Sequence, residues 1–321
     1  MFNTGINHFF QSFNNPIVHW FLNFVSLFGT TYFVIFVLLS LIGGVNFRKG
    51  FLVTYILAWV MLSTAFLKDY IDYPRPLAVD NTLNSFGVEK TVTNLVPLQP
   101  KGFFELFSNE LLYVTRQSDI ERTGFPSGHT SSTVAIWISL ALLLRKKWLW
   151  VFSIFFVVLM MISRLFLARH YLGDVTGGLI LGLTIVGVIY FLISKYNLES
   201  PNGLSRSLIT MFVFPLILIP MYKYIPSFES GCLLGISLAF LIILKIWGNR
   251  TVAVQLWKKV CSVSIFFSIF VALYFFGKTL HLQNLTLIGL LYYTASSLMS
   301  ILLSTYIVIK LRLVSISQLN N

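Results

Sequence analysis

The chain has 321 residues, of which 56% are hydrophobic and only 11% are charged, and its mean hydropathy is +0.81. A soluble domain of this length does not need so much apolar surface, so the composition excludes an ordinary soluble protein and indicates one whose solvent is largely lipid. The formal net charge of +12 comes in short clusters beside apolar stretches rather than on a basic surface or arm, which argues against nucleic acid as a partner.

The first residues of the chain predict an N-terminal, in-plane amphipathic helix. Apolar side chains recur there at helical spacing, and Asn15 followed by Pro16 is typical of an N-cap and a first helical position. We expect residues 1–30 to lie in the plane of the membrane surface, and the alternative is that residues 17–28 belong to a span. The first positive residue is Arg48, so the segment lacks the charged start of a secretory signal and is expected to remain in the mature protein.

Nine apolar stretches without Lys, Arg, Asp or Glu follow along the chain, and each is a candidate transmembrane helix. They are residues 31–47, 51–67, 131–144, 148–162, 175–193, 208–222, 231–244, 260–276 and 285–309. Several are shorter than the ~20 residues that cross a bilayer core, so the helices must extend into flanking polar residues. The sequence therefore predicts an all-α, polytopic transmembrane bundle of about nine spans, with polar side chains at the membrane boundary.

One long connection and one turn-rich segment organise the spans. The connection 69–128 joins the second and third spans, and its segment 101–116 has the composition of a short amphipathic helix, which either lies on the bilayer or packs the loop down. A turn-rich segment follows the fifth span. We therefore predict an interfacial segment at 1–30, a five-helix core at 31–195 and a four-helix extension at 196–321.

Prolines and glycines predict two details of the spans. Pro215 and Pro220 are expected to kink or shorten the sixth span, since proline cannot donate a helical hydrogen bond. Gly178 and Gly182, four positions apart on the fifth span, are typical of a face that packs closely against another helix.

The distribution of charge predicts the orientation. Lys and Arg accumulate in the short cytoplasmic loops of membrane proteins. With alternating spans, one side holds thirteen basic residues and the single acid Glu199, whereas the other side holds ten basic and ten acidic residues. The thirteen are Arg48, Lys49, Arg145, Lys146, Lys147, Lys195, Arg206, Lys245, Arg250, Lys258, Lys259, Lys310 and Arg312. We expect that side and the C-terminus in the cytoplasm of a bacterial inner membrane protein, and the loop 69–128 on the periplasmic, extracytoplasmic side.

Two polar clusters lie at predicted extracytoplasmic ends of spans. The first, Lys68-x6-Arg75-Pro76, ends the second span with two cations. The second, Pro126-Ser127-Gly128-His129, opens the third span, where unpaired backbone amides and the positive end of the helix dipole favour an anion. The second cluster is therefore suited to binding a phosphate group, whereas the first, taken alone, also fits an ordinary lysine and arginine at a membrane boundary.

A third cluster, Ser163-Arg164-x5-His170-x3-Asp174, joins the fourth and fifth spans. If residues 170–174 are helical, their i,i+4 spacing puts the Asp174 carboxylate beside the His170 ring. The carboxylate would then set the tautomer and leave the other ring nitrogen free to attack phosphorus, while Arg164 clamps the phosphate.

The three clusters, in this order and spacing, resemble the signature motifs of the type 2 phosphatidic acid phosphatase superfamily, which also includes glucose-6-phosphatase and vanadium haloperoxidases. The resemblance covers about residues 30–195. It implies that His170 forms a phosphohistidine, that His129 protonates the leaving group and that Asp174 orients His170. It also implies a phosphate-binding set of Lys68, Arg75, Ser127, Gly128 and Arg164.

The sequence offers no group of carboxylates or Cys/His pairs suited to a divalent ion, so we expect a reaction without metal or other cofactor. Three histidines outside the motifs, His8, His19 and His281, are expected to have interfacial or packing roles. Arg122 and Arg169 are near the motifs and either add positive potential or balance neighbouring acids.

The predicted function is therefore hydrolysis of a phosphomonoester or diphosphate of a membrane lipid, whose tail stays in the bilayer while its headgroup reaches the site. The motifs do not choose among phosphatidic acid, phosphatidylglycerophosphate, undecaprenyl diphosphate, lipid A and a sphingoid phosphate, nor do they indicate an oligomeric state. Two alternatives remain: a glucose-6-phosphatase-like enzyme for a soluble sugar phosphate, and a non-enzymatic lipid transporter or binding relative.

Overall fold

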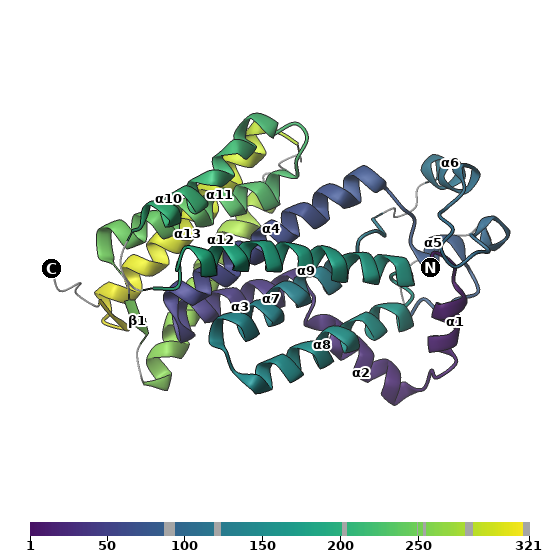
Figure 1. The fold of residues 1–321 in the computed structure, drawn as a ribbon, viewed down its shortest axis with the longest axis horizontal. Helices are drawn as coiled ribbons and strands as arrows, with labels where there is room; N and C mark the ends of the chain where they lie inside the picture. The colour runs from purple at the N-terminus through teal and green to yellow at the C-terminus, as the bar shows by residue number, and fades with distance from the viewer. Residues whose placement is uncertain are drawn as a thin grey trace. The chain divides into compact units, whose positions relative to one another are not determined.

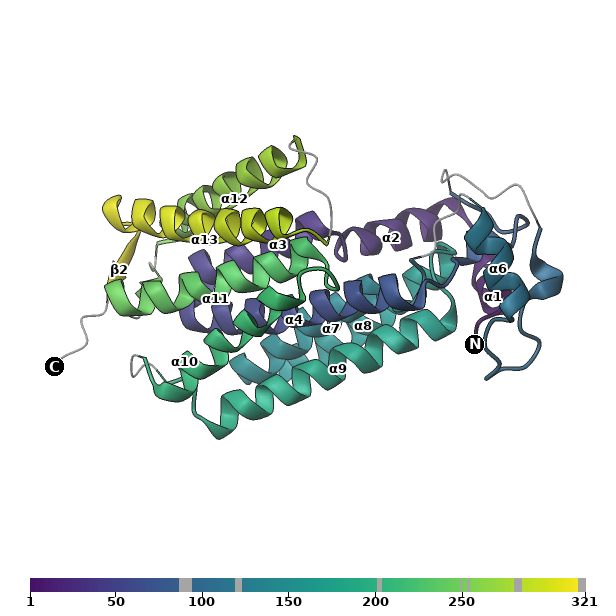
Figure 2. The same ribbon diagram turned by 90° about the horizontal axis from the view of Figure 1, so that it is seen from above.

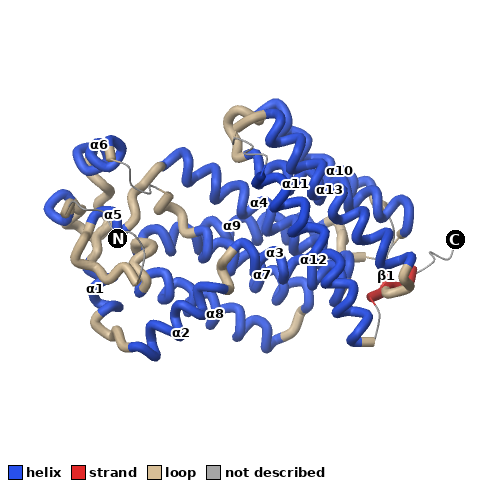
Figure 3. The backbone as a smooth tube through the Cα atoms, turned by 180° about the vertical axis from the view of Figure 1, so that it is seen from behind, coloured by secondary structure: helices blue, strands red, loops and turns tan. Residues whose placement is uncertain are grey.

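The structure, a computed structural model, describes residues 1–86, 94–118, 123–200, 204–248, 250–252, 255–279 and 285–316. Over these residues the regular structure is helical except for one antiparallel pair of short strands, β1 (Arg250–Val252) and β2 (Val314–Ile316), drawn in red in Figure 3. The predicted all-α class is confirmed.

The elements follow the predicted apolar stretches. In the first part of the chain they are α1 (Gly5–Gln11), α2 (Pro16–Leu27), α3 (Thr31–Ser40), the π-helix η1 (Leu41–Val45), α4 (Phe47–Ile71), α5 (Pro76–Val79), the 3₁₀ turn η2 (Val96–Leu98) and α6 (Asn109–Gln117). Then come α7 (Gly128–Leu144), α8 (Lys147–Phe166), α9 (Leu172–Lys195), α10 (Arg206–Val213), the 3₁₀ helix η3 (Phe214–Met221), α11 (Ser227–Trp247), α12 (Leu256–Thr279) and α13 (Leu287–Lys310).

Six of the described helices are long and apolar enough to cross a membrane: α4, α8, α9, α11, α12 and α13. Helix α2 and the segment Thr31–Val45 pass the same test only together, as a pair bent by 54°. Two further apolar helices, α7 and the segment Arg206–Met221, are shorter. The chain is therefore an integral membrane protein, and the count of nine spans stays a prediction.

The N-terminal segment forms two helices rather than one. Asn15 caps α2 as predicted, because its side chain accepts the backbone N–H of Val18 at 3.0 Å, and Pro16 occupies the first helical turn. Helix α2 either lies in the plane of the membrane or forms half of the bent pair, the two possibilities that the sequence leaves open.

The chain forms two compact units. Unit 1 comprises Met1–Phe33 and Ser63–Val186, and unit 2 comprises Val34–Leu62 and Gly187–Asn321. In unit 1, helices α1, α2 and α7 pack along α8 (Figure 1). In unit 2, helices α11 and α12 pack along α13 (Figure 2). All eight predicted site residues lie in unit 1, whereas the functional division of the chain at residues 30 and 195 stays a prediction.

The predicted glycine face packs helix α9 against helix α7. A Cβ atom added to Gly178 would lie 2.5 Å from the carbonyl oxygen of Ser127, and one added to Gly182 would lie 2.9 Å from Cβ of Val134. Such distances are far below van der Waals contact, so no larger residue fits at either position without a shift. The close approach brings the start of α9 next to the start of α7.

The amphipathic helix predicted at 101–116 begins later, at Asn109. The Ser108 side chain caps it by accepting the backbone N–H of Leu111 at 3.2 Å. Upstream, the Glu105 carboxylate accepts the backbone N–H groups of Lys101 and Gly102 at 2.9 and 2.8 Å. These bonds close a turn in place of the first helical turns.

The sixth apolar stretch, which its two prolines were expected to kink or shorten, changes its helix type. Helix α10 ends at Val213 and continues as the 3₁₀ helix η3, which has Pro215 near its start and Pro220 inside it. Because neither proline supplies an N–H, the α-helical bonds of this stretch are interrupted there.

Candidate active site

The second motif forms the start of helix α7 and is bonded to the third motif. Ser127 is the N-cap of α7, and its hydroxyl accepts the Thr130 hydroxyl at 3.1 Å and the Thr130 backbone N–H at 3.4 Å. The backbone N–H of Ser127 donates to the carbonyl oxygen of Asp174 at 2.9 Å. The positive end of α7 therefore lies beside the first turn of α9.

The first motif meets the second where helices α4 and α7 cross. A Cβ atom added to Gly128 would lie 3.8 Å from Cε of Lys68, an ordinary contact distance, so the Lys68 stem lies against the start of α7. Hydroxyl groups of Thr64 and Ser131 hydrogen bond at 2.9 Å and hold the same two helices together. The Lys68 amine is thereby placed at the positive end of the α7 dipole.

Thr123 links both cations of the first motif, and sequence reasoning missed it. The Lys68 amine donates to the carbonyl oxygen of Thr123, and Nη2 of Arg75 donates to its hydroxyl at 3.0 Å. The next residue, Gly124, donates its backbone N–H to the carbonyl oxygen of Tyr73 at 2.9 Å. A threonine three positions before a Pro-Ser-Gly-His motif carries no signal that distinguishes it from an ordinary loop residue.

The third motif places His170 between two helices. Helix α8 ends at Phe166 and α9 begins at Leu172, so the assumption that residues 170–174 are helical is wrong. The predicted pair nevertheless forms, with His170 Nδ1 3.4 Å from Oδ2 of Asp174. The same oxygen accepts the backbone N–H of Tyr171 at 2.8 Å, which resembles the reciprocal bond of a capping box. His170 is 2% exposed and Asp174 is fully buried.

Burial and surrounding charge keep His170 neutral. Burial lowers the pKa of His170 well below its usual range, and the positive charges of Lys68, Arg164 and Arg75 lower it further. These cations come from the end of α4, the last turn of α8 and the start of α5, so three parts of unit 1 direct positive charge at one imidazole. A neutral imidazole has the lone pair that a nucleophile needs.

Arg164 is buried at the end of helix α8 and is held by the N-terminal segment. Its Nη1 atom donates to the hydroxyl of Ser26. The neighbouring Ser163 hydroxyl donates to the carbonyl oxygen of Leu22 at 2.7 Å. Neither partner on α2 was recognised from the sequence.

The other basic residues that the sequence singled out make contacts outside the three motifs or lie in the connection before α9. His8 Nε2 lies 2.9 Å from Oδ2 of Asp80, and the ring of His19 stacks on Phe86 at 4.5 Å between centroids. The backbone N–H of Arg169 donates to the carbonyl oxygen of Arg164 at 3.1 Å. His281 and Arg122 lie outside the described residues.

Among the residues that the structure describes, no group of three or more His, Cys, Asp or Glu side chains is arranged to hold a metal ion.

Comparison with known proteins supports the resemblance. Residues 48–198, which contain all eight predicted site residues, match the PAP2 superfamily. The resemblance inferred from the three motifs is confirmed. The chain is also similar to lipid A 4'-phosphatase of Bacteroides thetaiotaomicron, with 31% identity over 116 residues, which are 36% of this chain and 49% of that protein. The chain thus spans about half the length of this curated relative. No solved structure matches the chain.

Proposed function

We propose that the chain is an integral membrane phosphatase that hydrolyses a phosphomonoester or diphosphate of a membrane lipid through a phosphohistidine on His170. The observation that carries the proposal is the buried His170, with Asp174 3.4 Å from one ring nitrogen, and with a pKa that burial and the charges of Lys68, Arg164 and Arg75 lower. The match of residues 48–198 to the PAP2 superfamily and similarity to a protein named lipid A 4'-phosphatase support it. The six described helices that are long and apolar enough to cross a membrane fit a substrate with a lipid tail.

The first chemical step would be attack by His170. Nε2 forms a bond to phosphorus as the bond from phosphorus to the leaving oxygen breaks, and His129 gives its proton to the departing alkoxide or phosphate. Asp174 stabilises the positive charge that develops on the His170 ring, because it faces Nδ1. In the second step water attacks the phosphohistidine, His129 takes the proton of the water, and inorganic phosphate leaves.

The remaining motif residues would bind the phosphoryl oxygens. Lys68, Arg75 and Arg164 neutralise the oxygens during transfer, and the start of helix α7 at Ser127 and Gly128 adds backbone N–H groups and the helix dipole. These charges supply electrostatic stabilisation of the transferring group from the protein itself. We therefore expect phosphate release in the presence of a metal chelator.

The experiment that tests the function is phosphate release by the purified protein from lipid monophosphates, lipid diphosphates and glucose 6-phosphate, with a chelator present. We expect release from at least one lipid and none from glucose 6-phosphate. Release from glucose 6-phosphate alone would favour the sugar-phosphate alternative, whereas no release from any compound would favour a binding or transport role. Loss of all activity on chelation would contradict the metal-independent mechanism.

The proposed location is a bacterial inner membrane with the site on the extracytoplasmic face and the C-terminus in the cytoplasm. The support is the charge asymmetry of the loops. Arg116 is half exposed in α6, and Lys147 is exposed at the start of α8, on the opposite predicted side. In a cysteine-free background, Arg116→Cys should react with an impermeant reagent added outside, and Lys147→Cys should react only after permeabilisation. Labelling of both from one side would exclude this topology.

A further inference from the structure

The first 29 residues lie outside the region matched to the superfamily, yet they contact two of the three motifs in the structure. We propose that this N-terminal segment is part of the active site, with Asn7 as a positioning residue for His170 and Ser26 as a positioning residue for Arg164. All these residues belong to unit 1. The inference deepens the proposed function and rests on it.

Asn7 bridges the end of helix α8 and the nucleophile. Its side chain is fully buried, and Nδ2 donates to the carbonyl oxygen of Leu165 at 2.8 Å and to that of His170 at 3.0 Å. Because His170 lies between two helices, helical hydrogen bonds do not hold it in place. The amide of Asn7 therefore ties the backbone of His170 to the last turn of α8.

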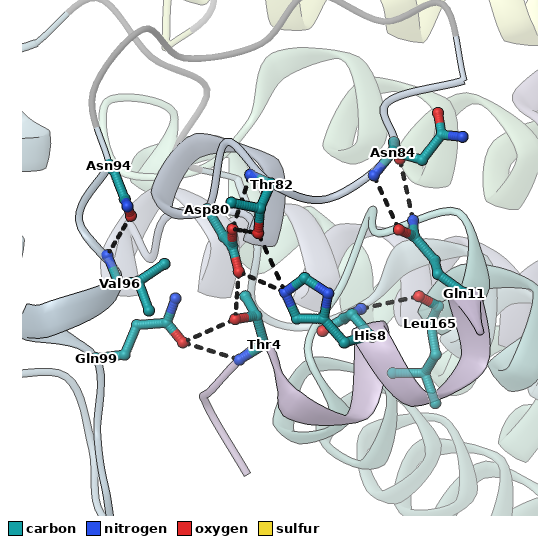
Figure 4. Close-up of polar contacts among 11 residues, drawn as sticks. Thr4, His8, Gln11, Asp80, Thr82, Asn84, Asn94, Val96, Gln99 and Leu165 are labelled. Atoms are coloured by element: carbon teal, nitrogen blue, oxygen red, sulfur yellow. Dashed lines mark hydrogen bonds and ion pairs between the residues drawn. The ribbon is translucent and has the colours of Figure 1, made fainter.

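Helix α1, which carries Asn7, is itself anchored by a buried carboxylate (Figure 4). Oδ2 of Asp80 accepts the Thr4 hydroxyl at 2.7 Å and lies 2.9 Å from Nε2 of His8, and Oδ1 accepts the Thr82 hydroxyl at 2.6 Å. Burial raises the pKa of Asp80, but the hydrogen bonds from Thr82, Thr4 and His8 outweigh burial and leave it below its usual range. The carboxylate is thus ionised at neutral pH and holds α1 against the segment that follows α5.

Gln11, one turn after Asn7 on the same helix, is a matched counterpart. Its Nε2 atom donates to the carbonyl oxygens of Asn84 and Phe166, each at 3.0 Å. Figure 4 shows Gln11 directed at Asn84. Both amides thus tie α1 to two backbone carbonyls, but only that of Asn7 reaches a residue of the proposed reaction.

Ser26 gives the segment a second attachment, to the phosphate clamp. Its hydroxyl oxygen accepts a hydrogen bond from Nη1 of Arg164, and both side chains are buried. A bond at one nitrogen restricts the direction of a planar guanidinium, and a guanidinium of fixed direction suits binding of a tetrahedral oxyanion. Loss of this acceptor would leave the direction of the Arg164 side chain less restricted.

Two close approaches of the backbone show how tightly the segment fits. A Cβ atom added to Gly29 would lie 2.4 Å from Cδ2 of His129, and one added to Gly173 would lie 2.4 Å from Cζ of Phe2. The backbone N–H of Gly173 also donates to the carbonyl oxygen of Met1 at 3.2 Å. The segment therefore packs against the proposed acid and against the turn that carries His170 and Asp174.

The test compares steady-state kinetics of Asn7→Ala and Gln11→Ala, each of which removes an amide that donates to two carbonyls. Since a displacement of about 1 Å costs on the order of 100-fold in rate, we expect Asn7→Ala to lower kcat about 10-fold or more with KM within about two-fold. Gln11→Ala should keep both constants within about two-fold of wild type. Equal effects of Asn7→Ala and Gln11→Ala in an active protein would overturn the role of Asn7.

The role of Ser26 is tested in the same assay. Ser26→Ala should raise KM about five-fold or more, and Ser26→Thr, which keeps the hydroxyl, should restore it.

A second measurement is the rise in melting temperature that a ligand causes. It needs no turnover, and because it is a difference within each variant, it does not depend on how stable that variant is. Inorganic vanadate mimics a transferring phosphoryl group, so it should raise the melting temperature of the wild-type protein. We expect Gln11→Ala to keep this vanadate-dependent rise, and Asn7→Ala, Ser26→Ala and the shape-preserving Asn7→Leu to lose half of it or more. An unchanged rise in these three variants would overturn the inference. Absence of phosphate release by wild type would instead count against the proposed function, and the vanadate comparison would still decide the inference.

Discussion

The Asp174 carboxylate oxygen Oδ2 lies 3.4 Å from Nδ1 of His170. This contact is longer than an ordinary hydrogen bond, whereas the bond of the same oxygen to the backbone N–H of Tyr171, at 2.8 Å, is of normal length. The backbone bond therefore fixes the carboxylate, and the carboxylate in turn faces the imidazole. This geometry favours the tautomer with the proton on Nδ1 and leaves Nε2 as the attacking atom.

Asp174→Asn tests the charge of this carboxylate separately from its position. The amide oxygen can keep the bond to Tyr171, so the fold and KM should change little, but the charge that stabilises the phosphorylated ring is lost. We expect kcat to fall by about 100-fold or more. The measurement is steady-state hydrolysis of the best substrate, with the circular dichroism spectrum as a control for folding. A variant with wild-type kcat would show that Asp174 has no electrostatic role.

The environment of His170 predicts how activity depends on pH. His170 must be neutral to attack, and its pKa is lowered by burial first and by the positive charge of Lys68 next. The acid limb of kcat/KM should therefore lie below the ordinary histidine pKa of about 6.5. Because Lys68→Gln removes a positive charge, it should move this limb to higher pH even as it lowers the maximal rate. A limb at 6.5 or above in wild type, or a shift to lower pH in the variant, would contradict this electrostatic account.

Gly29→Ala tests the fit around the proposed acid. The added methyl group would lie within 2.9 Å of Cβ of His129, so the ring must shift with its backbone attachment. We expect kcat to fall about 10-fold or more, since proton transfer needs hydrogen-bond geometry. Gly187→Ala is the matched control, because a methyl group there meets no atom of the described residues within 4 Å. Equal activity of the two variants would show that the position of His129 tolerates displacement.

Arg164→Lys keeps the positive charge but loses the planar fork. Lysine cannot donate to Ser26 and to two phosphoryl oxygens in the same arrangement, so kcat/KM should fall by about 100-fold. Arg116→Lys serves as the control, because Arg116 is half exposed and pairs with Asp72 at 3.4 Å. Its kinetics should stay within about two-fold of wild type, as expected for an exposed ion pair. If Arg164→Lys were as active as wild type, only the positive charge of Arg164, and not its planar shape, would matter for catalysis.

Asp80→Asn tests the anchor of helix α1. The amide cannot accept from Thr4, His8 and Thr82 as a carboxylate does, and the loss should cost about 1–3 kcal/mol of stability. Because the folded-state pKa of Asp80 is lowered, its contribution is present above the unfolded carboxyl pKa of about 3.9 and is lost as pH falls further. The melting temperature in detergent should therefore differ between wild type and variant at pH 7 and converge at strongly acidic pH. Glu110→Gln changes an exposed carboxylate and should have the melting temperature of wild type. If wild type and Asp80→Asn differed in melting temperature by the same amount at all pH values, this assignment would be refuted.

Local patterns in the sequence were sufficient to predict the helices, the three motifs and the pairing of His170 with Asp174. Polar residues such as Lys68 and Asp174 are conspicuous in an apolar chain, because lipid disfavours charge without a function. The helical assignment of residues 170–174 was wrong, since the first helical turn of α9 begins only at Leu172. The pair formed all the same, because a carboxylate in the first turn reaches back to the residues before the helix.

Only the tertiary structure decided which residues surround the motifs. Asn7 and His170 are 163 positions apart, and Ser26 and Arg164 are 138 positions apart, so no spacing rule connects them. An asparagine or serine in an amphipathic helix looks like any polar side chain at a membrane surface until the packing of α1 and α2 on α8 shows what it touches. The sequence by itself determined the chemistry available, since residue type sets charge and nucleophilicity. Packing between distant segments determined the geometry in which that chemistry is held, because such contacts depend on the shape of the whole unit.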